Sequence, residues 1–144
     1  MKKLLCLLLV LVSSTAYAGK DEREKQEEVT KEMPASQAAF KSACGCDLAF
    51  DVKWDTFQTF ETMRAVHGII DNVQSYAKDV CTDATAKKNV CKMKSMSISY
   101  APIAANATAN PDPVFNEATG VMTLVTNGMA VPDLQWMARN ILDK

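Results

Sequence analysis

Four cysteines have the residue type and spacing that best support chemistry in this chain: Cys44, Cys46, Cys81 and Cys91. In a reducing cytosol, a C-x-C pair with two further cysteines would indicate a zinc site. In an oxidising compartment the same residues would form two disulfides. A redox-active bond between Cys44 and Cys46 is a third alternative, because a C-x-C disulfide is strained and easily reduced.

The first 18 residues favour the disulfides. The chain begins Met-Lys-Lys, residues 4–12 are almost wholly apolar, and Ala-Tyr-Ala at 16–18 is the small-x-small pattern that precedes signal-peptidase cleavage. The apolar run is far shorter than the roughly 20 residues that span a bilayer. We therefore predict a cleaved signal peptide over residues 1–18 and a periplasmic or secreted protein with no stable membrane insertion.

Size and charge after cleavage restrict the class of partner. The mature chain has 144 − 18 = 126 residues, about the size of one domain. Loss of Lys2 and Lys3 leaves 16 − 2 = 14 basic residues against 17 acidic ones, a net charge near −3. That balance gives no electrostatic reason to bind nucleic acid, so we expect no nucleic-acid partner.

Two segments bring the cysteines together. Over residues 46–55, apolar and polar residues alternate, which predicts a half-buried strand. A helical period follows over residues 57–79, with an N-cap at Asp55-Thr56. About nine strand residues span about 30 Å, and about 23 helical residues span about 34 Å. The helix therefore returns to where the strand began, which places Cys81 beside Cys44 and Cys46.

This placement favours one disulfide pairing. Cys46 points inward on the first strand and should meet the start of the next strand, where Cys91 lies. We therefore prefer Cys46–Cys91 with Cys44–Cys81, and the crossed pairing remains open.

The remaining elements complete the predicted fold. Residues 82–90 form a helical turn or a loop, residues 92–100 form a second strand, and short strands cover 114–116 and 121–126. A final helix begins at Val131-Pro132-Asp133 and turns Leu134, Met137 and Ile141 inward. The order β-α-β-β-β-α predicts an α+β domain over residues 35–144. We expect a small mixed sheet, helices packed on one face and two disulfides at one end.

Residues 19–34 are dense in charge. Asp21 with Lys25 and Glu27 with Lys31 are acid-before-base pairs four residues apart, which support a solvated helix. No apolar stripe accompanies them, and Pro34 follows. We therefore expect a mobile N-terminal arm whose deletion leaves stability nearly unchanged, and a separate short helix over 36–43.

The histidine and methionines that could support catalysis or metal binding are better explained as structural residues. The single histidine, His67, lies four residues before Asp71 and could bond to it, but no catalytic motif surrounds either residue, so we predict no enzyme. Met93 and Met96 would point to opposite faces of a strand, which spoils a shared copper(I) site. We expect no metal and no cofactor.

Three aspartates supply the candidate binding surface: Asp47, Asp51 and Asp55. They share the outer face of the first predicted strand, at roughly 13 Å per four residues, too far apart for one calcium ion or for a carboxylate pair in hydrolysis. We interpret them as contacts for a partner protein, with the loop over 101–113 as a second surface. That loop contains a glycosylation sequon at Asn106, which matters only in a eukaryotic source.

These observations lead to two hypotheses of function. The first is a small exported protein-binding module, an inhibitor or immunity-type protein that caps an envelope enzyme or toxin, with another exported or envelope protein as its partner. The alternative is a periplasmic protein that handles soft metals or thiols through its cysteines and methionines.

Overall fold

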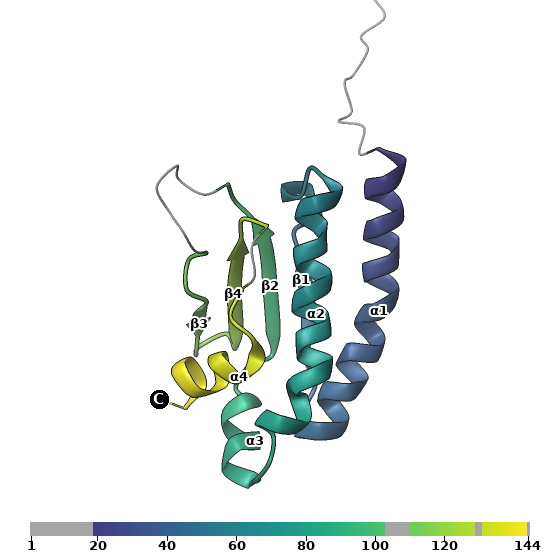
Figure 1. Cartoon of the computed structure of the whole chain (residues 1–144). Coiled ribbons are helices and arrows are strands. Elements are labelled where there is room, and N and C mark those ends of the chain that lie inside the picture. Colours follow the sequence, from purple (N-terminus) through teal and green to yellow (C-terminus); the bar gives the residue numbers. More distant parts are fainter. Residues whose placement is uncertain (1–18, 103–109, 129–130, 144) are drawn as a thin grey trace, which may run out of the picture.

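The computed structural model describes residues 19–102, 110–128 and 131–143. Over these residues the chain forms two layers, a four-stranded sheet and a set of helices on one of its faces (Figure 1). The predicted α+β class and mixed sheet are confirmed. The predicted signal peptide and the sequon at Asn106 lie outside the described residues.

The sheet has the strand order β1-β2-β4-β3. β1 pairs with β2 in parallel, β2 pairs with β4 in parallel, and β3 is antiparallel to β4. The strands span Ala49–Val52 (β1), Ser95–Tyr100 (β2), Val114–Asn116 (β3) and Val121–Thr126 (β4). β3 and β4 coincide with their predicted ranges, whereas β1 and β2 are shorter than predicted.

β1 ends early because the next residues turn across the end of β2. The Lys53 N–H still donates to the Ile98 carbonyl at 2.9 Å, and a 3-10 turn, η1 (Trp54–Thr56), follows. The Thr56 hydroxyl then accepts from the Tyr100 N–H at 2.9 Å. A side chain therefore replaces the strand partner that the alternating pattern predicted, and the N-cap expected at Asp55-Thr56 is wrong.

Helix α2 (Phe60–Val80) is capped by Thr59. The Thr59 hydroxyl accepts from the Thr62 N–H, and the Thr62 hydroxyl accepts from the Thr59 N–H, so two end groups are satisfied reciprocally. The predicted stripe is buried from Met63 onward, but Phe60 remains 37% exposed.

Helix α1 (Lys20–Cys44) corrects the predicted boundary at Pro34. The helix runs through the proline and lies beside α2, with a bend in its middle (Figure 1). Val29 and Phe40 are both fully buried, one on each side of Pro34. The separate short helix is therefore wrong, and the packed body begins well before residue 35. The stripe facing α2 is Val29, Met33, Ser36, Phe40 and Cys44.

One buried hydrogen bond joins α1 to α2. The Ser36 hydroxyl donates to the Ile70 carbonyl at 2.6 Å, and Ser36 is fully buried. Ser36→Ala and Ser42→Ala gain the same helix propensity, but only the first loses this bond, since Ser42 is exposed. We expect Ser36→Ala to have a free energy of unfolding about 1 kcal/mol below that of Ser42→Ala in urea titrations. Equal values would show that the bond does not stabilise the fold.

The two disulfides lie where α1 ends. Gly45 adopts φ 83° and donates its N–H to the Lys41 carbonyl at 2.8 Å, a left-handed cap that suits glycine. This turn directs its two neighbours to different partners, and the bonds are Cys44–Cys81 and Cys46–Cys91. The pairing is the one preferred from the inward direction of Cys46 on the first predicted strand. Two disulfides are typical of a protein outside the reducing cytoplasm.

Two short helices finish the body. Helix α3 (Ala84–Val90), capped by Asp83, occupies the segment predicted as a helical turn or a loop, and the first alternative is confirmed. Asp133 caps α4 (Leu134–Met137), which continues as a wider helical turn, η2 (Ala138–Leu142). Among the described residues, no helix has the length and hydropathy to cross a membrane.

Candidate functional site

One face of the sheet is not covered by any helix of the described residues (Figure 1). Met96, Ile98 and Leu124 point into the core, so alternate residues of the same strands point to the opposite face. We call this opposite side the open sheet face. It consists of Ala49, Asp51, Ser95, Ser97, Ser99, Val114, Asn116, Val121, Thr123 and Val125.

The open sheet face is built from small side chains. Ser97 lies between Asp51 and Thr123 in the register, and Thr123 pairs in turn with Val114, which is 66% exposed. Only Asp51 carries a charge there, and Lys53 Nζ lies 2.7 Å from its carboxylate. Small side chains allow a second flat surface to approach closely, because stacked sheets pack about 10 Å apart.

The three predicted contact aspartates do not form one acidic stripe. Asp47 precedes β1 and pairs with Lys41 at 2.9 Å, and Asp55 lies in η1. Only Asp51 belongs to the open sheet face, because β1 ends at Val52. Lysines pair with two of the three carboxylates, so the open sheet face is nearly neutral. A role of the three aspartates as partner contacts stays a prediction.

The predicted second surface, residues 101–113, falls largely outside the described residues. Its described end is anchored where the Asn110 side-chain oxygen accepts from the Asn127 N–H at 2.8 Å, and Pro113 is buried. A binding role for this loop stays a prediction.

The sulfur atoms give the alternative function no support within the described part of the chain. The cysteines at 44, 46, 81 and 91 are all in disulfides and offer no free thiol. Cys44 and Cys81 are also only 4% and 5% exposed. Met93 and Met96 are fully buried, as expected for core filler.

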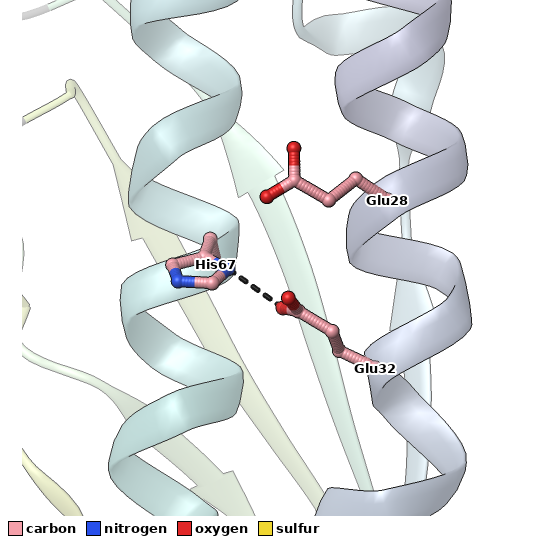
Figure 2. A group of neighbouring side chains, drawn as sticks. All are labelled: Glu28, Glu32 and His67. Atoms are coloured by element: carbon pink, nitrogen blue, oxygen red, sulfur yellow. Dashed lines mark ion pairs between the residues drawn. The ribbon is translucent and has the colours of Figure 1, made fainter.

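His67 faces α1 and not Asp71, the possible partner on its own helix. Its Nδ1 atom lies 2.7 Å from Glu32 Oε2, and Glu28 lies one helical turn before Glu32 (Figure 2). Asp71 is exposed on α2. The ordinary pairing expected for His67 is thus made across two helices, by residues that the sequence reasoning assigned to a mobile arm.

Lys25 completes this cluster. Its Nζ donates to Glu28 Oε1 at 2.8 Å, and the Lys25 side chain is only 10% exposed. The pKa of Glu28 is lowered, mainly by this hydrogen bond. Burial opposes the shift, and the nearby charges of Lys25 and His67 add to it.

A sequence signal for the cluster existed. Val29 and Met33 continue the spacing of Ser36 and Phe40 back through Pro34, and this stripe predicts that the first half of α1 docks. Glu28 and Glu32 flank the stripe four residues apart. The many charges of residues 19–34 and the helix-breaking tendency of Pro34 made this apolar stripe hard to recognise.

The groove beside α2 in the described part of the chain does not show a catalytic arrangement. One groove of about 370 Å³ lies between α2 and the segment around Gly128 and Val131. Its polar lining is Glu61, Arg64 and Asn72, and the first two form an ion pair at 3.5 Å. Neither a histidine nor a hydroxyl or thiol nucleophile is among the described residues that line it.

Comparisons with models of protein families, with curated proteins and with solved structures give no match. The function is therefore argued from the residues and geometry of this chain.

Proposed function

We propose that the mature chain is an exported protein-binding module that contacts its partner through the open sheet face. The observation that carries the proposal is that the central strands β2 and β4 have one side under the helices and the other bare among the described residues. An uncovered sheet face can pack against a flat surface of another protein. The disulfides keep it rigid, which lowers the entropic cost of binding.

The chemistry of the face defines the partner. With Asp51 paired to Lys53, the surface is close to neutral. The hydroxyls of Ser97 and Thr123 lie on its central strands, and the apolar Val114 lies beside Thr123 on the edge strand β3. The partner should be an exported or envelope protein that presents a flat surface of small apolar and hydroxyl groups. Capping an envelope enzyme or toxin is a role suited to a rigid, flat face.

A charge at the centre of the face tests this proposal. Thr123 is exposed, so Thr123→Lys should leave the fold intact, but an unpaired ammonium in the interface should cost about 2 kcal/mol, roughly 30-fold in affinity. The control is Gln74→Lys, the same new side chain at an exposed position of α2. Each protein is used to capture a stoichiometric partner from the exported fraction, and the affinity is then measured with the purified partner.

Loss of binding by Thr123→Lys alone would support the open sheet face as the interface. Equal binding by all three proteins would exclude it. Light scattering of the mature protein supplies a further check. A dimer that Thr123→Lys dissociates would show that the face binds a second copy of the chain, which contradicts a partner of another kind.

A further inference from the structure

Glu28, Glu32 and His67 form a compact set between α1 and α2 (Figure 2). One ligand atom from each lies within 4.8 Å of the other two. The two carboxylates come from successive turns of α1, and the imidazole comes from the facing side of α2. Disulfide Cys44–Cys81 ties the far ends of the same helices, so the facing positions are held in register.

The donor set is that of a transition-metal site. Zinc accepts histidine nitrogen and carboxylate oxygen at about 2.0–2.2 Å, which places tetrahedral ligands about 3.3 Å apart. His67 Nδ1 and Glu32 Oε2 are 2.7 Å apart, so these two atoms must separate by about 0.6 Å to admit the ion. The widest separation, at most 4.8 Å, must shrink by about 1.5 Å. Rotations of the long glutamate side chains cover that distance.

The geometry at His67 Nδ1 also favours a bound cation, although the His67 side chain as a whole is 40% exposed. This atom is shielded from solvent and has no aligned hydrogen bond, although Glu32 Oε2 lies 2.7 Å away. The contact with Glu32 compensates this shielded nitrogen only in part, because its geometry is not that of a hydrogen bond. A cation between the nitrogen and the carboxylates would satisfy all of them at once.

We propose that Glu28, Glu32 and His67 bind a divalent transition-metal ion of the zinc type, which clamps α1 to α2. Three protein ligands leave at least one coordination position for water or another small ligand. Lys25 opposes the ion in two ways, by its positive charge and by its bond to Glu28 Oε1. The ion therefore binds Glu28 through the other oxygen or displaces Lys25.

The experiment is a zinc titration of the mature, disulfide-bonded protein by calorimetry, with cobalt absorption as a report on ligand type. We expect one equivalent to bind. His67→Ala and Glu32→Gln should each weaken binding by at least about tenfold. Glu27→Gln, an exposed neighbour on α1, should leave it unchanged. Lys25→Met should tighten binding, because it removes a competing cation.

Thermal unfolding gives a second measurement. Zinc in hundredfold excess over its dissociation constant should raise the Tm by about 5–10 °C, and His67→Ala should remove that rise. Circular dichroism confirms that each variant is folded, and His67→Gln serves if His67→Ala is not.

Absence of zinc binding, or binding that His67 and Glu32 substitutions do not alter, would overturn the site and leave two ion pairs. Thr123→Lys should still bind zinc, so failure of this site and failure of the open sheet face are distinguishable.

Discussion

Removal of both disulfides should leave the mature protein largely unfolded at room temperature. The bonds join residues 37 and 45 positions apart, and closing loops of these lengths stabilises a fold by about 4 kcal/mol each on the chain-entropy model. A domain of this size has about 5–15 kcal/mol in total. We expect each paired Cys→Ala variant to lose about 4 kcal/mol in urea titrations, and the quadruple variant to lose most of its native circular dichroism.

The two bonds should also differ in their response to reductant. Cys44 and Cys81 are 4% and 5% exposed, whereas Cys46 and Cys91 are only partly buried. Because thiolate attack requires access to sulfur, Cys46–Cys91 should open first in a mild reductant. Thiol alkylation followed by peptide mass spectrometry identifies the order. A quadruple variant as stable as the native chain would contradict the role assigned to both bonds.

The disulfide framework could be predicted from the sequence because it depends on lengths. A strand and a returning helix of similar length put Cys81 back beside Cys44, and this holds although β1 is shorter than the alternating pattern suggests. β3 and β4 were also predictable, since Gly120 interrupts two short apolar runs. Gly120 has φ 71°, and a Cβ there would lie 2.8 Å from the Lys92 carbonyl oxygen. Few other residues fit this turn.

The candidate sites were harder to predict because they depend on tertiary contacts. The end of β1 depends on the Thr56 hydroxyl, which meets the Tyr100 N–H far along the chain. The open sheet face depends on a strand order that local patterns do not encode. The cluster of Glu28, Glu32 and His67 requires α1 to lie on α2. The charge density of residues 19–34 does not indicate that contact, which the buried Val29 makes evident.

Val29→Asp should show whether the first half of α1 belongs to the fold. Val29 is fully buried, and an unpaired carboxylate at such a position costs about 3–5 kcal/mol. Thr30→Asp adds the same charge at the next, exposed residue and should be nearly neutral. Urea unfolding measures the difference. If the two variants are equally stable, residues 19–34 are a mobile arm, as the sequence predicts.

The part of the chain that Val29→Asp unfolds can also be identified. Cys44–Cys81 holds the last turn of α1 against α2, so Val29→Asp can release the first half of the helix without unfolding the rest. Hydrogen exchange should then be faster over residues 20–33 than over the sheet. Glu28 and Glu32 would leave His67 in the same event, and zinc binding should be lost while both disulfides persist. Full zinc affinity in a variant whose first half exchanges freely would place the metal elsewhere.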